Sequence, residues 1–362
     1  MWVRVVYFIF ILTFISCVSN NDGKKEGVYN WDNKEVLLEV QDSIEIDTII
    51  DYIIQIHKIG DSFLIEYPYD WAVFKKKGNK LFFESFLIRK GNGPWETLAS
   101  TRLAQLNDGR LFLGECIGSE KICISATACE KNIEEITEWN IAKRSGTNPF
   151  YFESIQPVND KIVIGGIQGN NVSKFVAYNL YENKYQSLNY TYPSLYDDLS
   201  DFEKSYATEG VLMKKPDANK YLFSTKTGAY TFIFDCNGET ISNIKMMYNL
   251  PAKYKTSGEQ GKRPKLLDAQ TKYNVMPYVT SNCIYMSDRY FTVKDVFGDS
   301  GLDELPYYYT KEVVSFDWAG NPYRKYLLQH PIRSMFVNDG DSVLYGLGAN
   351  DERDLILVYS LR

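Results

Sequence analysis

The chain has 362 residues, of which 44% are hydrophobic and 15% are aromatic, so it is long enough and apolar enough to bury a large core. Its formal net charge is −6. Binding to nucleic acid requires a concentrated basic surface, so this acidic balance argues against nucleic acid as a partner.

The first residues have the form of a signal peptide. Arg4 precedes an apolar run over residues 5–15, which is shorter than the ~20 residues that a transmembrane helix needs. The run ends at Phe14-Ile15-Ser16-Cys17, which resembles a bacterial lipoprotein box. We therefore expect residues 1–16 to be a lipoprotein signal peptide and Cys17 to be lipidated, with an uncleaved transmembrane helix as the alternative. Residues 17–33 are polar and contain glycine, which predicts a flexible tether.

From residue 34 to residue 362 one pattern recurs six times. A polar turn such as Asn338-Asp339-Gly340 is followed by a short apolar strand such as Val343-Leu344-Tyr345. The equivalent turn positions are Asp61, Asp108, Asp160, Asp217, Asn282 and Asp339. Their spacing runs from 47 residues, between Asp61 and Asp108, to 65 residues, between Asp217 and Asn282. Repeats of about 40 to 50 residues are typical of four-stranded propeller blades, so we interpret the copies as blades with insertions.

A second hairpin follows most of these turns, and its two strands differ in polarity. The strand before the turn is apolar, as in residues 175–178, and the strand after it is more polar, as in residues 184–188. Inner strands of a blade are covered on both faces, whereas the outermost strand meets water. The sequence thus predicts an all-β fold, a six-bladed β-propeller of four-stranded antiparallel blades.

The sixth blade lacks an outer strand, because the sequence reaches Arg362 soon after the strand at residues 355–359. An isolated strand signal over Lys34–Val40 precedes the first blade. We expect this N-terminal strand to pair in the last blade, which would close the ring and remove exposed sheet edges.

The segment between the first two blades reads Arg89-Lys90-Gly91-Asn92-Gly93-Pro94-Trp95-Glu96. It resembles a stretch of the six-bladed propeller lipoproteins of Bacteroidetes, the TolB-like family, which reads approximately Arg-Lys-Gly-x-Gly-Pro-Gly-Glu; here Trp95 replaces the usual Gly. The resemblance implies the propeller fold and a location in the cell envelope, and it brings no catalytic residues. The glycines and Glu96 favour a structural crossover between blades, while contact of Arg89, Lys90 and Trp95 with a ligand is the alternative.

In an antiparallel four-stranded blade, the first and third turns lie on one face of the ring, and the middle loop and the crossover to the next blade lie on the other. The long segments, residues 89–102, 140–153, 190–210, 251–274 and 295–311, all belong to the second face. In repeat proteins, the face that carries the long loops usually carries the binding site. The candidate ligand-binding residues there are Arg89, Lys90, Trp95, Arg102, Arg263, Tyr307, Tyr308 and Tyr309.

Two of these crossovers have opposite charge. Residues 190–210 are acidic and predict a short helix, whereas residues 251–274 are basic, so the two loops could simply attract each other. Tyr307, Tyr308 and Tyr309 could stack on sugar rings or anchor a protein partner, although blade packing explains most of the 28 tyrosines.

The sequence gives little support for catalysis. The two histidines, His57 and His330, sit in no recognisable nucleophile or metal motif, and no cofactor is predicted. The alternative is a calcium ion bound at the pore, because carboxylates scattered along the sequence could come together there. Cys116 and Cys123 could form a disulfide across a hairpin, but buried free thiols are the expected state of the cysteines after Cys17.

These observations predict a lipid-anchored binding module of the cell envelope, at the outer membrane, that binds a protein or glycan on its long-loop face. The alternative is a hydrolase or lactonase-like enzyme with a metal site at the pore mouth. Convergent carboxylates around the pore would favour the enzyme, and an open aromatic face would favour the binding module.

Overall fold

The structure is a computed structural model that describes residues 29, 31–46, 53–68, 70–91, 96–97, 101–106, 110–115, 121–124, 137–140, 150–169, 171–259, 261–267, 277–287, 309–349 and 354–362. The predicted signal peptide, Cys17 and most of the tether lie outside these residues, as do Trp95, Cys116, Tyr307 and Tyr308. Of Arg102 and Cys123 only the strand positions are described.

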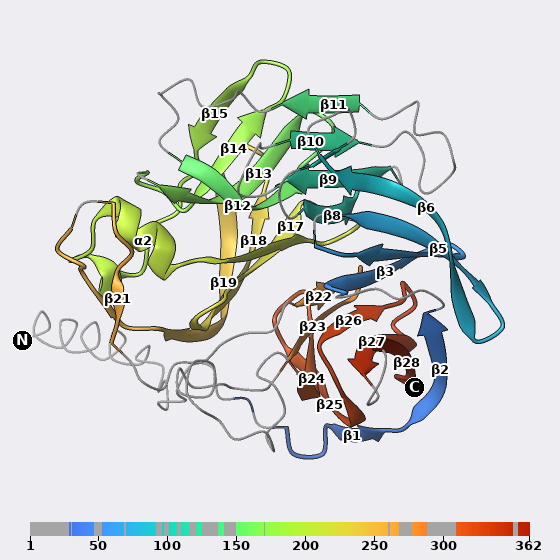
Figure 1. Ribbon diagram of the computed structural model, residues 1–362. Coiled ribbons are helices and arrows are strands. Elements are labelled where there is room, and N and C mark those ends of the chain that lie inside the picture. The colour runs from blue at the N-terminus through green and yellow to red at the C-terminus, as the bar shows by residue number, and fades with distance from the viewer. Residues whose placement is uncertain are drawn as a thin grey trace, which may run out of the picture.

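Six blades surround a common axis (Figure 1), each with four antiparallel strands; in the first five blades these strands are consecutive in the chain. The first three blades are β3 (Gln55–Ile59), β4 (Ser62–Glu66), β5 (Trp71–Lys77) and β6 (Lys80–Lys90); β8 (Thr101–Gln105), β9 (Leu111–Glu115), β10 (Lys121–Ile124) and β11 (Thr137–Asn140); and β12 (Phe150–Pro157), β13 (Ile162–Gly169), β14 (Phe175–Asn179) and β15 (Lys184–Ser187). The next two are β16 (Gly210–Lys214), β17 (Lys220–Thr225), β18 (Gly228–Cys236) and β19 (Ile241–Pro251); and β22 (Tyr278–Val279), β23 (Cys283–Ser287), β24 (Thr310–Asp317) and β25 (Pro322–Ile332). The sixth combines β26 (Ser334–Val337), β27 (Val343–Ala349) and β28 (Asp354–Ser360) with the N-terminal β2 (Val40–Ile46).

The first strand of every blade lies nearest the axis, and these inner strands follow one another around it. β8 contacts β12, β12 contacts β16, β16 contacts β22, β22 contacts β26, and β26 contacts β3. The predicted turn positions Asp61, Asp160, Asp217, Asn282 and Asp339 all lie between the first two strands of a blade, whereas Asp108 lies outside the described residues. The predicted six-bladed antiparallel propeller is therefore confirmed.

Apolar side chains fill the gaps between blades. Six of the hydrophobic clusters each join two neighbouring blades; the one between the third and fourth blades is built on Phe175, Phe223 and Phe232. The outer strand β15 is exposed along its length, while β14 beside it is buried except at Asn179, as the polarity pattern predicts. Cys236 and Cys283 are buried free thiols, which confirms that expectation for these two residues.

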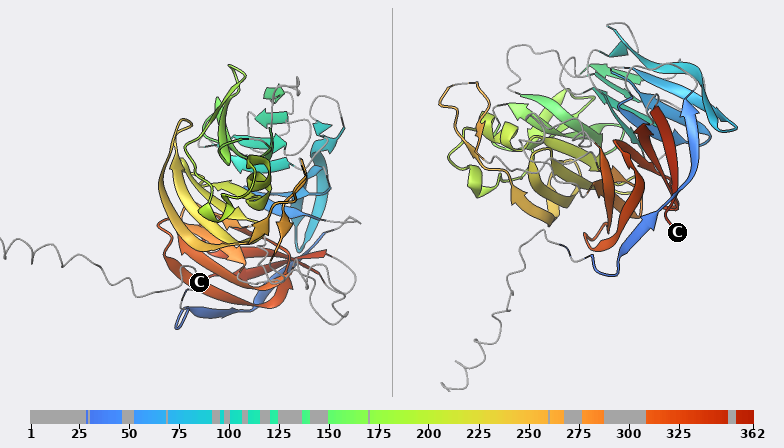
Figure 2. Two further views of the ribbon diagram at one scale, coloured as in Figure 1. Left: turned by 90° about the vertical axis from the view of Figure 1, so that its left-hand side faces the viewer. Right: turned by 60° about the horizontal axis from the view of Figure 1, so that its bottom comes forward.

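The ring closes through the N-terminal segment, which runs along the edge of the last two blades (Figure 2). β2 pairs antiparallel with β28 as the outer strand of the sixth blade, so closure from the N-terminus is confirmed. β2 also pairs in parallel with β6 through Glu45 and Ile46, which joins the sheets of the sixth and first blades.

The sequence predicts Lys34–Val40 as the closing strand, and this prediction is wrong by one strand: the closing strand is β2, the next one in the chain. β1 (Glu35–Leu38) pairs in parallel with β25 on the edge of the fifth blade, and of the predicted Lys34–Val40 strand only Val40 pairs with β28. Both segments carry apolar side chains on one face, so periodicity alone does not choose between them. Packing does, because Leu38 joins the cluster between the fifth and sixth blades, whereas Ile44 and Ile46 join the cluster between the sixth and first.

The two faces of the ring differ in their connections. The short-turn face carries the first and third turns of each blade, such as the turn at residues 317–321, where the Asp317 carboxylate accepts from the amides of Ala319 and Asn321. The long-loop face carries the middle loops and the crossovers. The remaining elements lie there: β7 (Glu96–Thr97), η2 (Ser194–Tyr196), α2 (Asp201–Ala207), β20 (Tyr254–Lys255) and β21 (Lys265–Leu266).

Candidate functional site

The short helix α2 organises the long-loop face between the third and fourth blades. Ser200 caps it: the Ser200 hydroxyl accepts from the Glu203 amide at 3.3 Å, and the Glu203 carboxylate accepts from the Ser200 amide at 3.1 Å. The helix predicted in the acidic crossover is thus confirmed. The same helix packs on β13 of the third blade.

Glu203 also fastens the next crossover to this helix. Its Oε1 accepts from the Thr256 hydroxyl at 2.9 Å and from the Ser257 amide at 2.7 Å. Burial acts to raise the pKa of this carboxyl, but the hydrogen bonds from Ser257, Ser200 and Thr256 outweigh it and lower the pKa to about 2. The acidic and basic crossovers therefore meet through a carboxylate that accepts from hydroxyl and amide groups.

An aromatic surface lies over this contact. The Arg263 guanidinium stands 4.7 Å from the centre of the Tyr206 ring, and Phe202 lies 4.8 Å from Tyr206 on the other turn of α2. The Tyr151 hydroxyl donates to Gln168 Oε1 at 2.6 Å and lies 2.5 Å from the Tyr206 hydroxyl, so Tyr206 donates to Tyr151. The rings of Tyr151 and Tyr206 are half-buried, and Arg263 is exposed.

A charged pair borders these rings. Lys226 and Glu209 form an ion pair at 2.6 Å, with the side chains 43% and 25% exposed. Burial acts to raise the pKa of Glu209, but Lys226 and then Arg263 outweigh it and hold the pKa below its usual value. We call Tyr151, Phe202, Tyr206, Glu209, Lys226 and Arg263 the crossover cluster. It presents aromatic faces, one cation and one ion pair to solvent on the long-loop face.

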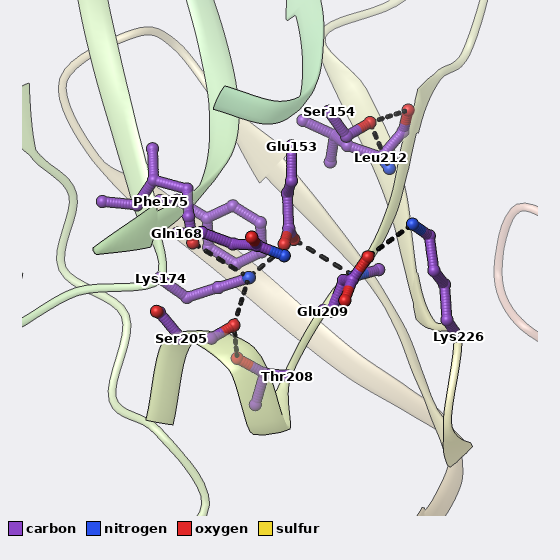
Figure 3. Close-up of polar contacts among 12 residues, drawn as sticks. Glu153, Ser154, Gln168, Lys174, Phe175, Ser205, Thr208, Glu209, Leu212 and Lys226 are labelled. Carbon is purple, nitrogen blue, oxygen red and sulfur yellow. Dashed lines mark hydrogen bonds and ion pairs between the residues drawn. The ribbon is translucent and has the colours of Figure 1, made fainter. Parts of the chain in front are cut away.

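A fully buried ion pair lies beneath the cluster (Figure 3). Lys174 and Glu153 are joined at 2.6 Å with neither side chain exposed. Lys174 also donates to the carbonyl oxygens of Ile167 at 3.1 Å and Ser205 at 3.0 Å, and Glu153 accepts from the Gly210 amide at 3.1 Å. Because Ser205 belongs to α2, this ammonium ties the helix to the third blade.

The protonation of this pair depends on its surroundings. Burial raises the pKa of Glu153 to about 7, although the nearby Lys174 acts in the opposite direction, and burial lowers the pKa of Lys174. Each charge is held in place by the other, since neither would remain ionised alone in such a site. The pair therefore gives the crossover cluster a rigid base.

The candidates near the first crossover occupy a separate place. Arg89 and Lys90 are exposed at the end of β6, with the Arg89 guanidinium 4.4 Å from the Phe86 ring. β7 pairs in parallel with these two residues. The Glu96 carboxylate lies against Gly91, where an added Cβ would overlap it and make it move. These contacts support the structural interpretation of the motif.

Of the eight predicted ligand contacts, only Arg263 belongs to the crossover cluster. Arg102 is in β8, and Tyr309, which directly precedes the fifth blade's third strand, is only 8% exposed. The sequence reasoning missed the other five members, which are Tyr151, Phe202, Tyr206, Glu209 and Lys226. A usable signal was Glu153 directly after the aromatic run Phe150–Phe152 in a strand, because a charge within a buried strand implies a buried partner.

A cavity of about 190 Å³ lies on the axis of the ring and is lined by residues from all six blades. His57, Gln156, Lys214, Tyr278 and Phe336 are among its lining residues. Burial lowers the pKa of His57 to about 4, so the imidazole is neutral at physiological pH. Within the described part of the chain, no three His, Cys, Asp or Glu side chains are grouped so that they could hold a metal ion.

A closed ring of six four-stranded blades with a central cavity defines the class of six-bladed β-propellers. The chain belongs to the TolB-like propeller family, since the family model described as TolB-like 6-blade propeller-like matches residues 34–340. The chain matches none of the curated proteins. Among the elements that are described, no helix is long and apolar enough to cross a membrane.

Two solved structures from Bacteroides are similar to this one. A member of the DUF4221 family from Bacteroides vulgatus has 11% sequence identity and a TM-score of 0.54, with 89% of this chain and 97% of that chain covered. An auxiliary nutrient binding protein from Bacteroides thetaiotaomicron has 8% identity and a TM-score of 0.49, with 86% of this chain and 70% of that chain covered. At such identities the likeness concerns the fold alone.

Proposed function

We propose that this protein is a lipid-anchored binding module of the cell envelope and that the crossover cluster on its long-loop face contacts a protein or glycan ligand. The observation that carries this proposal is the stacking of the Arg263 guanidinium on Tyr206, whose hydroxyl is fixed by Tyr151. Tyrosine and arginine dominate the binding energy of many interfaces, because they offer large contact area together with polar groups.

The rigidity of this surface supports the proposal. Tyr206 lies on a helix that is capped by Ser200, hydrogen-bonded through Glu203 and tied to the third blade by Lys174. A ligand that meets pre-positioned side chains loses less of its binding free energy to side-chain ordering. The same rings could stack on the faces of sugar residues, so a glycan ligand uses the same cluster.

The test is recovery of the ligand from native envelopes. The wild-type protein and the Arg263→Ala variant would be cross-linked in intact cells, purified, and compared for bound protein and bound carbohydrate. We expect Arg263→Ala to reduce recovery at least about tenfold, the loss typical of an interface hot spot. The neighbouring Lys262→Ala is the matched control, since Lys262 is exposed and forms an ion pair with Glu259 of the same crossover. Equal recovery with both variants would contradict the proposal.

The membrane anchor is a separate part of this proposal. It rests on the lipoprotein box at residues 14–17. We expect Cys17→Ala to move the protein from the membrane fraction to the soluble fraction, while Ser19→Ala leaves it in the membrane. If Cys17→Ala stays with the outer membrane after fractionation, the anchor is wrong even where ligand recovery is normal.

A further inference from the structure

The first residues that the structure describes, Tyr29 and Trp31, are fixed to the ring by aromatic contacts. Both side chains pack against the hydrophobic cluster that joins the fourth and fifth blades. The Tyr29 ring lies 5.2 Å from Tyr248 and 4.9 Å from Phe316, and the Trp31 ring lies 5.6 Å from Phe316. The Tyr29 hydroxyl also donates to the carbonyl oxygen of Met247 at 2.7 Å. The point at which the N-terminal segment meets the ring is therefore well defined.

This point lies at the short-turn face. The cluster that holds the two rings includes Trp318, which belongs to the third turn of the fifth blade. Lys34 donates to the carbonyl oxygen of Pro322 at 2.8 Å, directly after the same turn. β1 then runs parallel to β25, which starts at this turn and ends at the long-loop face. The chain thus reaches the ring at the face opposite to the crossover cluster.

The predicted lipidation site is close to this point along the chain. Cys17 precedes Tyr29 by 12 residues. A polar, glycine-containing tether of this length has a root-mean-square length of about 20 Å and spans at most about 43 Å when fully extended. The eight-residue strand β13 is about 26 Å long, so the blades alone separate the two faces by roughly that distance. A membrane at the long-loop face would therefore require a tether that is almost fully extended, which costs conformational entropy.

The surface beside the attachment has side chains that suit a membrane surface. Tyr323, which follows the third turn of the fifth blade, is 52% exposed, and Leu37 of the edge strand β1 is 67% exposed. Tyrosine is enriched at membrane–water interfaces, because its ring is apolar and its hydroxyl is polar. These two side chains can meet the headgroup region without leaving the ring.

From these features we infer that the short-turn rim of the fourth and fifth blades rests on the membrane surface and that the crossover cluster faces away from it. This inference rests on the lipid anchor of the proposed function and adds an orientation to it. The ligand of the crossover cluster would then approach from the aqueous space and would not be a headgroup of the anchoring membrane.

Energy transfer to labelled lipids tests the orientation. The full chain would be purified from membranes in its lipidated form and placed in vesicles of phosphatidylethanolamine and phosphatidylglycerol that carry an acceptor dye on their headgroups. A donor dye would be attached through an unnatural amino acid at one of two exposed positions, Ala319 in the third turn of the fifth blade or Lys255 in β20. We expect transfer from position 319 to be at least about twofold more efficient, since roughly 26 Å of strand separates the two faces.

A longer tether is the matched control. An insertion of about 30 glycine and serine residues after Gly23 raises the root-mean-square length of the tether to about 35 Å and leaves the contacts of Tyr29 in place. It should bring the two efficiencies together, and Tyr29→Ala combined with Trp31→Ala should reduce the difference between them. A thermal melt verifies that each protein is folded.

Two results would contradict the inference in distinguishable ways. Equal efficiencies in vesicle-bound wild-type protein, or higher efficiency from position 255, would overturn the orientation and leave the anchor and the ligand of the crossover cluster intact. Wild-type protein that does not stay with the vesicles would overturn the anchor of the proposed function and the orientation together.

Discussion

The short-turn face and the long-loop face of the ring are built on the same blades but differ in structure. On the short-turn face the described first turns of the blades reverse within a few residues, and residues of these turns, such as Gly60, Pro216 and Asp339, line the axial cavity. On the long-loop face the third and fourth crossovers bring a helix and a hairpin, and a buried ion pair of the third blade ties the helix down, so that together they hold an aromatic surface. The comparison shows that short turns leave the axial cavity as the blades shape it, whereas long crossovers build the crossover cluster on top of the blades.

If the surface is built on the buried ion pair, removing one member should have the largest effect. Lys174→Met leaves the Glu153 carboxylate buried without its cation, and we expect a loss of about 3–5 kcal/mol in the free energy of unfolding. Chemical denaturation measures this loss. Lys184→Met, which removes an exposed lysine, is the control and should change the free energy by less than about 1 kcal/mol. A small effect of Lys174→Met would mean that the face does not depend on the pair.

Removing the link between the two crossovers, Glu203, should have the second-largest effect. Glu203→Ala removes a carboxylate that caps α2 and accepts from Thr256 and Ser257, so we expect a loss of about 2–3 kcal/mol. Amide hydrogen exchange should increase in the fourth crossover as well as in α2. Asp198→Ala changes an exposed acidic residue of the same crossover and should leave exchange unaltered. Exchange that increases in α2 alone would contradict the link.

On the axis of the ring, we expect His57 to make the free energy of unfolding depend on pH. The pKa of His57 is lowered to about 4 in the folded protein from 6.5 in the unfolded chain. The unfolded chain therefore binds a proton first as pH falls, and stability should decrease progressively between about pH 6.5 and about pH 4, by about 2 kcal/mol near pH 5. Lys58, Lys214 and Asp339 share this cavity. His57→Gln should reduce the decrease by that amount, whereas His330→Gln, at an exposed position, should not.

The smallest expected effect concerns the helix cap alone. Ser200→Ala removes the hydroxyl that accepts from the Glu203 amide, at a cost of about 1 kcal/mol. Thermal unfolding should show a slightly lower midpoint, and Ser194→Ala, at an exposed position of the same crossover, should show none. An effect as large as that of Glu203→Ala would mean that the cap, and not the link to the next crossover, fixes the helix.

The sequence predicted the parts of this molecule that depend on local chemistry. Turn residues such as Asp160 and Asp339 and the short apolar strands after them marked the blades, and the acidic residues 190–210 predicted a short helix, which is α2. The other features depend on residues that are distant in sequence. Whether the first strand joins the fifth or sixth blade is decided by packing, and a cavity lined by six blades leaves no pattern in any one of them.

The pairing of Val40 with Tyr359 also constrains how the protein is made. β2 is synthesised before the five blades that separate it from β28, so these blades must persist with an unpaired edge until β28 has been made. Contacts between residues so far apart in sequence form slowly, and unpaired strand edges aggregate. We therefore expect the nascent chain to depend on chaperones until β28 is free to pair with β2.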